Sequence, residues 1–240
     1  MTRKSPTGAS AKRTKKGSRA TGSPFSVPEV DNVSLVERQA VLASRRAAQR
    51  DPEGEALERA AQRYSAGRAR ERLPHRIETR RLILRAPIRG DVPALVTLAD
   101  NPNIAKMLRR LPSPYTRADA IAFVEIFAQR ADERPYAITL DGNFVGVVGF
   151  TFHADAAPEL GYWLGEPHWG KGLMSEAVAG LLEAARNTGA FPEVQATARA
   201  ENAASLRVLE KTGFRVLKIK AESRKKDAIK IAYLSRELVR

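Results

Sequence analysis

The fold of this chain of 240 residues is decided by residues 202–214, NAASLRVLEKTGF, taken together with residues 168–174, HWGKGLM. Asn202 is a residue type that favours the N-cap of a helix, and Gly213 is typical of the position just after a helix ends. No glycine or proline lies between them, so a helix is predicted over residues 202–211. Phe214 opens an apolar run that predicts a strand. The segment is therefore expected to be a helix that leads directly into a strand.

The second stretch places two glycines between a predicted strand and a predicted helix. Gly170 and Gly172 let the backbone approach a ligand closely, and the following helix adds unpaired N–H groups and a positive dipole end. This geometry suits a pyrophosphate, and Lys171 would add a charge. A tight turn without a ligand is the alternative. The P-loop spacing is absent, and Ser175 stands where a dinucleotide-binding G-x-G-x-x-G motif needs its third glycine.

Together the two stretches resemble the acyl-CoA motifs of the GNAT superfamily of N-acetyltransferases. The family's Q/R-x-x-G-x-G/A motif aligns with Trp169 to Met174, and its N-x-x-A/S…G-F motif aligns with Asn202, Ser205, Gly213 and Phe214. Residues 159–164, ELGYWL, and 80–85, RRLILR, look like the RimJ/RimL branch, which acetylates the N-termini of ribosomal proteins. The resemblance covers roughly residues 77–238.

Three positions depart from the family pattern. Trp169 replaces Gln or Arg, a form common in this branch, and Met174 replaces the final Gly or Ala, which narrows the cradle slightly. Leu209 stands where many members carry a tyrosine thought to protonate the departing thiolate. The resemblance therefore implies cofactor binding without that tyrosine acid.

What the resemblance implies for the site is direct attack of a neutral amine on the thioester of acetyl-CoA. The expected oxyanion donor is a backbone N–H near Tyr162–Leu164, where the central strand splays from its neighbour. Glu159 is the first candidate for the base, with a solvent-facing residue or a holder of a cationic substrate as alternatives. Ser205 is a candidate to donate a hydrogen bond to the cofactor sulfur or to relay a proton through water, with ordinary helix surface as the alternative. The predicted cofactor-binding residues are Tyr162, Trp163, Leu164, Trp169, Gly170, Lys171, Gly172, Leu173, Met174, Asn202 and Ser205.

The rest of the chain beyond residue 77 alternates between predicted strands and helices. Asp141-Gly142 favours a tight hairpin, and Thr116 with Asp119 forms a capping box at a helix start. Strands are predicted at 81–86, 135–140, 143–152, 158–164, 193–199, 214–220 and 228–236, and helices at 90–99 (capped by Asp91), 116–131, 172–187 and 202–211. The order predicts an α/β fold. The resemblance specifies it as GNAT-type, a mixed, mostly antiparallel splayed sheet with helices on both faces.

The N-terminal third has a different composition. Residues 1–76 hold 17 Lys and Arg against 8 Asp and Glu, most of the net charge of +14. We expect a disordered basic tail over residues 1–33, a helical extension and linker over 34–76 with helices at 34–50 and about 52–72, and the acetyltransferase domain over 77–240. The tail is either a solvated localisation segment or a contact for the ribosome or nucleic acid.

Other classes of function are disfavoured by composition. The chain has no cysteine and three widely spaced histidines, so neither a thiolate nucleophile nor a metal is expected. No apolar run reaches membrane-spanning length, and a cytoplasmic location is the expectation, with an organelle transit peptide as the alternative. The leading hypothesis is acetyl transfer to a primary amine, such as a protein N-terminus. The alternatives are a small-molecule amine acetyltransferase and a non-catalytic CoA-fold protein held to ribosomes or RNA by the tail.

Overall fold

A computed structural model describes residues 54, 57, 61, 67–108, 111–153, 156–224 and 227–238, without the side chains of 223, 224, 227 and 228. The predicted basic tail 1–33 and the predicted helix 34–50 lie outside these residues. The predicted helix over about 52–72 is described only in part, with residues 54, 57, 61 and 67–72 helical. No helix in this part of the chain is long and apolar enough to cross a membrane.

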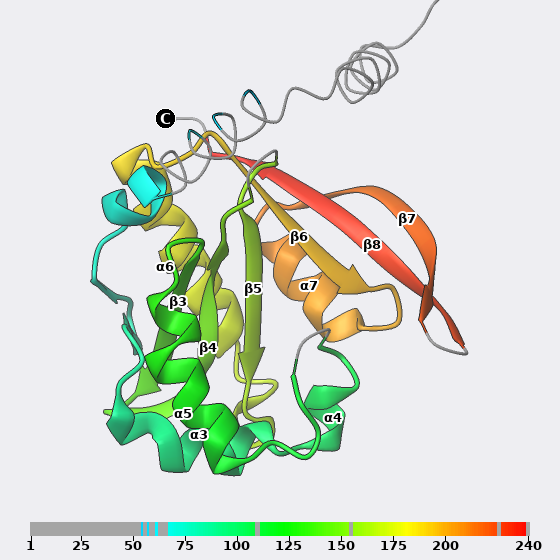
Figure 1. Cartoon of the computed structure of the whole chain (residues 1–240). Coiled ribbons are helices and arrows are strands. Elements are labelled where there is room, and N and C mark those ends of the chain that lie inside the picture. Colours follow the sequence, from blue (N-terminus) through cyan, green and yellow to red (C-terminus); the bar gives the residue numbers. More distant parts are fainter. Residues whose placement is uncertain are drawn as a thin grey trace, which may run out of the picture. The chain divides into compact units, whose positions relative to one another are not determined.

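The strands of the described residues form one eight-stranded sheet in the order β1-β2-β3-β4-β5-β6-β8-β7 (Figure 1). Their bounds are β1 Arg76–Glu78, β2 Leu82–Arg85, β3 Glu133–Leu140, β4 Asn143–Thr151, β5 Glu159–Leu164, β6 Glu193–Arg199, β7 Arg215–Arg224 and β8 Asp227–Glu237. All neighbouring strands are antiparallel except β5 and β6, which are parallel. The expected mixed, mostly antiparallel sheet is confirmed.

Helices cover both faces of this sheet, as expected. The bounds are α3 Val92–Ala99, α4 Pro102–Ala105, α5 Arg117–Glu125, α6 Leu173–Thr188 and α7 Ala203–Lys211, with 3-10 turns η1 Arg89–Asp91, η2 Phe127–Gln129 and η3 Glu166–His168. One apolar core joins α6 and α7 to the sheet, and a second joins α3 and α5 to it. The chain is therefore a layered α/β domain.

The helix predicted over 116–131 is shorter than expected. Its start is confirmed, because Thr116 and Asp119 form the capping box, but α5 ends at Glu125 and continues as η2. Gln129 Nε2 donates to the Val124 carbonyl at 3.3 Å, which satisfies a carbonyl at the helix end. Asp91 also differs from its predicted role: it precedes α3 without a capping bond, and its carboxylate binds Arg85 instead.

The pairing between β5 and β6 is short, and this positions the candidate site. β5 and β6 pair only at Glu159 with Gln195 and at Leu160 with Ala196, although β5 continues to Leu164 and β6 to Arg199. Beyond Leu160 the two parallel strands diverge, as Figure 1 shows. The expected splay in the middle of the sheet is confirmed.

Residues before β1 are held on this domain by side chains of the sheet. Arg70 Nε donates to the Glu133 carbonyl at 2.9 Å, and Arg134 donates to the carbonyls of Leu73 and Pro74 at 3.1 Å each. Leu73 is 1% exposed and belongs to the α6–α7 core. The end of the N-terminal extension therefore packs on the sheet.

Candidate active site

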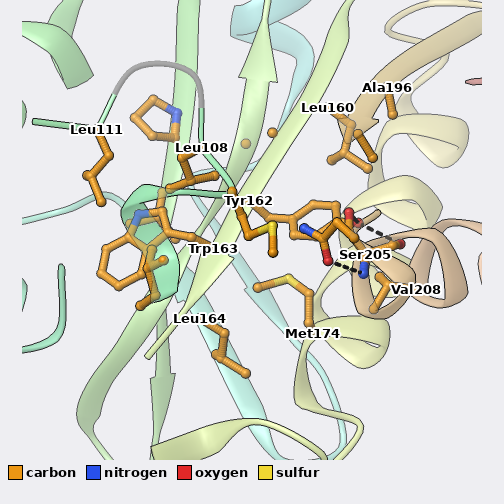
Figure 2. Close-up of a pocket in the computed structure, with 18 of the residues that line it drawn as sticks. Leu108, Leu111, Leu160, Tyr162, Trp163, Leu164, Met174, Ala196, Ser205 and Val208 are labelled. Atoms are coloured by element: carbon orange, nitrogen blue, oxygen red, sulfur yellow. Dashed lines mark hydrogen bonds between the residues drawn. The ribbon is translucent and has the colours of Figure 1, made fainter. Parts of the chain in front are cut away.

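A cavity of about 1300 Å³ opens where β5 and β6 diverge. Its walls come from β5, the start of α6, β6, α7 and the segment from α4 to α5. Figure 2 shows Tyr162 at its centre, pointing from β5 toward Ser205 on α7, with Met174 nearby. Every residue in the sequence-based site prediction lines this cavity except Lys171.

The loop before α6 has the backbone that the two glycines predicted. Gly170 and Gly172 have φ angles of 75° and 72°, in the left-handed region that favours glycine. A Cβ atom on Gly170 would meet nothing within 4 Å, so the space beside the backbone is open. Gly172 is the N-cap of α6, which leaves the first N–H groups of the helix directed at the cavity. Lys171 lies apart, with its Nζ donating to the Pro167 carbonyl at 2.9 Å.

The backbone of β5 directs alternate N–H groups into the gap. Gly165 N donates to the Val145 carbonyl of β4, so the alternation of an antiparallel pair turns the N–H groups of Tyr162 and Leu164 away from β4. The ladder to β6 has already ended at Leu160. The Leu164 carbonyl, on the same side, accepts from Trp169 Nε1 at 2.7 Å. Trp163 belongs to the opposite core, where its ring lies 5.9 Å from that of Phe144.

Asn202 and Ser205 meet at the start of α7. The Asn202 carboxamide oxygen accepts from Ser205 N at 3.1 Å, which confirms Asn202 as the N-cap. The Ser205 hydroxyl lies 2.9 Å from the Tyr162 hydroxyl, and the Ser205 carbonyl accepts from that phenol at 3.2 Å. Burial raises the pKa of Tyr162 to about 12, against a smaller opposing effect of the Ser205 hydrogen bond. The Tyr162–Ser205 contact was not predicted from the sequence.

Glu159 lies on β5 at the closed end of the gap. Thr197 Oγ1 donates to one carboxylate oxygen at 2.6 Å, and His153 Nε2 lies 3.3 Å from the other. Thr197 and His153 also line the cavity, although sequence reasoning assigned neither to the site. Their contacts hold the carboxylate toward the cavity.

A further contact, which was not predicted from the sequence, holds the glycine loop in place. Glu176 on α6 accepts hydrogen bonds from the Thr79 hydroxyl, the Arg81 backbone N–H and Arg81 Nε, each at 2.7 Å. Arg81 also donates to the Lys171 carbonyl at 3.1 Å. Only the position of Glu176, in the first turn of a predicted helix, hinted at this role.

His168 lies next to the loop and lines the cavity. Burial and the nearby Lys171 charge lower the pKa of this imidazole. Within the described residues no cluster of three or more His, Asp or Glu side chains is arranged to hold a metal ion.

A splayed parallel strand pair, a glycine loop at a helix N-terminus and an Asn-capped helix meet at one cavity, which is the arrangement that the resemblance to the GNAT superfamily implies. The sequence model of the acetyltransferase (GNAT) domain matches residues 81–215, more than half of the chain, and the chain belongs to this family. The resemblance inferred from the two motifs is thereby confirmed.

Among curated proteins, the chain is similar to the ribosomal-protein-serine acetyltransferase of Escherichia coli K12, with 28% identity over 88 residues, which are 36% of this chain and 49% of the relative. The chain spans less than half the length of the curated relatives that it matches. The expected likeness to the RimJ/RimL branch is supported by this relative.

Solved structures show the same fold. RimL, a ribosomal L7/L12 alpha-N-protein acetyltransferase in complex with coenzyme A, has 23% identity and a TM-score of 0.62 over 68% of this chain and 97% of its own. The microcin C7 self-immunity acetyltransferase MccE, in complex with acetyl-CoA and AMP, has 20% identity and a TM-score of 0.60 over 66% of this chain and 93% of its own.

Proposed function

We propose that this protein transfers the acetyl group of acetyl-CoA to a primary amine, specifically the α-amine of a protein N-terminus, and does so in the cytoplasm. The observation that carries the proposal is the cavity at the β5–β6 divergence, which is lined both by the glycine loop before α6 and by the Glu159 carboxylate. Family membership and the relatives that carry acetyltransferase names support it.

The residues present fit acetyl-CoA. The left-handed Gly170 and Gly172 and the N–H groups of the first turn of α6 would hold the pyrophosphate, because they combine open space with unpaired donors. Tyr162 and Leu164 would offer backbone N–H groups to the pantetheine amides or to the thioester oxygen. Asn202 would contact the cofactor through its amide nitrogen while its oxygen caps α7.

When bound, acetyl-CoA supplies an acetyl group activated as a thioester. Glu159 accepts the amine proton, directly or through water, with Thr197 and His153 fixing its orientation. A backbone N–H of Tyr162 or Leu164 stabilises the developing oxyanion, since it points into a gap already free of a neighbouring strand. Ser205 donates a hydrogen bond to the sulfur atom.

The choice of acceptor follows from amine chemistry and the relatives. An α-amine has a pKa of about 7.7–8.0, so a substantial fraction of it is neutral near pH 7.5–8, whereas a lysine amine with a pKa near 10.4 is almost entirely charged. A site whose base is a hydrogen-bonded carboxylate therefore suits the α-amine better. The similar ribosomal-protein-serine acetyltransferase supports a protein N-terminus as acceptor. Contact of the basic tail with the ribosome remains a prediction, because residues 1–33 lie outside the described part.

The test measures release of free CoA from acetyl-CoA by the purified full-length chain. The acceptors are a peptide with a free N-terminal serine, the same peptide blocked at its N-terminus but carrying lysine, and a panel of small amines. We expect turnover with the free α-amine and at least tenfold less with the blocked peptide. Faster turnover with a small amine would redirect the proposal to that class, and no CoA release with any acceptor would refute it.

The residue assignment has its own test. Glu159→Gln should lower turnover about 10²-fold, the usual contribution of a general base, with CoA affinity unchanged. Thr197→Val serves as the matched variant, because it removes only the hydrogen bond that orients the carboxylate. Full activity in Glu159→Gln would exclude Glu159 as the base.

A further inference from the structure

Tyr162 joins the two walls of the cavity. Its backbone belongs to β5, and its hydroxyl reaches Ser205 on α7, 43 positions later in the chain. Figure 2 shows the Tyr162 side chain directed at Ser205, with Met174 and Val208 nearby, and all four residues line the cavity. The contact is therefore part of the cavity and lies on the side where α6 and α7 meet β5.

Either hydroxyl could donate in this contact, and the chemistry of the two groups favours the phenol. The phenol lies 2.9 Å from the Ser205 hydroxyl and 3.2 Å from the Ser205 carbonyl, so its one proton faces two acceptors on the same residue. A phenol is a stronger acid than an aliphatic alcohol and is the better donor of the two. Burial raises the pKa of Tyr162 to about 12, so the phenol keeps its proton at every pH at which the protein works.

If the phenol donates, the hydroxyl proton of Ser205 is not used in this contact. The N–H of Ser205 is held by the Asn202 oxygen at 3.1 Å, and its carbonyl accepts from the Tyr162 phenol at 3.2 Å. With the phenol as donor, the Ser205 hydroxyl oxygen, 2.9 Å away, is an acceptor as well. Its own hydroxyl proton is then left for a ligand in the cavity. Leu209, one turn further along α7, is buried and has no polar atom to offer.

We propose that Tyr162 is a positioning residue that turns the Ser205 hydroxyl proton toward the sulfur atom of bound CoA. The proposal rests on the proposed function and deepens it. In the transfer, the amine nitrogen forms a bond to the thioester carbon and the carbon–sulfur bond breaks. Sulfur leaves with the electron pair, and the amine proton passes to Glu159 or water.

No proton moves through Tyr162 in this step. The phenol donates to Ser205 Oγ, which strengthens the hydrogen bond that Ser205 donates to the sulfur, because chained hydrogen bonds polarise one another. The apolar side chains of Met174 and Val208 line the cavity beside the pair, and the lower local dielectric constant that they provide increases this effect. The thiolate takes its final proton from solvent.

The test compares binding of CoA with binding of desulfo-CoA, which lacks only the sulfur. Calorimetry at pH 9.5, where a thiol of pKa about 8.5 is mostly ionised, measures both dissociation constants for the wild type, Tyr162→Phe, Ser205→Ala and the double variant. We expect Tyr162→Phe to weaken CoA about tenfold, the size of one hydrogen bond, and desulfo-CoA less than twofold. The double variant should be no weaker than Ser205→Ala alone.

Steady-state kinetics supply a second readout. Tyr162→Phe should lower kcat at least tenfold with the KM for acetyl-CoA within twofold, whereas a merely structural role would raise KM or lower the melting temperature. The control is Tyr136→Phe, which removes another buried phenol hydroxyl, the donor to the Pro74 carbonyl at 2.6 Å, away from the cavity. It should cost stability while leaving the preference for CoA over desulfo-CoA unchanged.

The outcomes separate the two proposals. If the wild type binds neither ligand and releases no CoA, the proposed function fails. If the wild type binds CoA and turns over, but Tyr162→Phe loses equal affinity for CoA and desulfo-CoA or keeps full kcat, the positioning role of Tyr162 is overturned.

Discussion

Glu176 is the residue whose removal tests how the glycine loop is held. Its carboxylate accepts three hydrogen bonds of 2.7 Å and is 15% exposed, and the Arg81 side chain that pairs with it is 34% exposed. Each hydrogen bond to a charged group contributes about 1.5–3 kcal/mol, but the three are not additive and water reaches Arg81. We therefore expect Glu176→Ala to lower the free energy of unfolding by about 2–4 kcal/mol.

The contribution of Glu176 to the free energy of unfolding should depend on pH. Burial alone would raise the pKa of Glu176, but the hydrogen bonds from Thr79 and Arg81 outweigh it and lower the pKa below its ordinary 4.5. The contribution to stability is therefore complete above pH 4.5 and is lost as pH falls through the folded-state pKa. Glu176→Gln, which cannot ionise, should differ from the wild type at pH 7 and approach it only as pH falls through the lowered folded-state pKa of Glu176.

The assay is urea unfolding at pH 7 and at two lower pH values, with CoA titration at pH 7. Because Arg81 also donates to the Lys171 carbonyl, releasing Arg81 should loosen the loop and weaken CoA about tenfold. A loss of stability below 1 kcal/mol, or a difference between wild type and Glu176→Gln that is constant with pH, would refute this account of the loop.

Two further predictions concern a tightly packed glycine of β4 and the ion pair between Asp91 and Arg85. Gly149→Ala would place a Cβ atom 2.5 Å from the Arg134 carbonyl oxygen, so the free energy of unfolding should fall by about 3 kcal/mol or more. Gly161 is the control: it pairs with Gly149 on β5, and a Cβ atom there would meet nothing within 4 Å, so Gly161→Ala should change the free energy of unfolding by less than about 0.5 kcal/mol. Equal effects would contradict the packing at β4. Asp91→Asn should cost about 2–3 kcal/mol, because the Asp91 carboxylate is buried but the Arg85 charge that it leaves is 25% exposed. Replacing both by Arg85→Met and Asp91→Leu should cost less, and thermal unfolding that shows the reverse order would argue against this account of the ion pair.

Much of the fold could be predicted because its decisive features are local. The strand at 193–199 has the predicted bounds, and the Asp141-Gly142 hairpin forms with both residues at positive φ. The Asn202 cap and the left-handed Gly172 likewise follow from the chemistry of single residues and their immediate neighbours.

The missed elements are too short for a periodic pattern. β1 has three residues and α4 has four, so neither completes enough of a repeat to be told from a loop. The predicted end of the helix at 131 failed for another reason: its apolar repeat continues through Phe127, while the backbone already leaves the helix at Ile126.

The contacts that organise the site could not be predicted, because they join distant parts of the chain. Thr197 reaches Glu159 only through the register of β5 with β6, which depends on two residue pairs. Tyr162 meets Ser205 because α7 packs against the end of β5, and Arg81 meets Glu176 across 95 positions. Sequence patterns identified the residue types, and the tertiary structure decides their partners.

The short β5–β6 pairing also divides the sheet into two leaves. β1 to β5 form one leaf and β6, β8 and β7 the other, and the described strands of the two leaves share a ladder at only two residue positions. Beyond these two pairs, the edge of the first leaf that faces the second is the backbone of β5 at Tyr162 and Leu164. Because their N–H groups point away from β4 and have no β6 partner in the ladder, this edge has the hydrogen-bonding pattern that an extended ligand bearing amides would need.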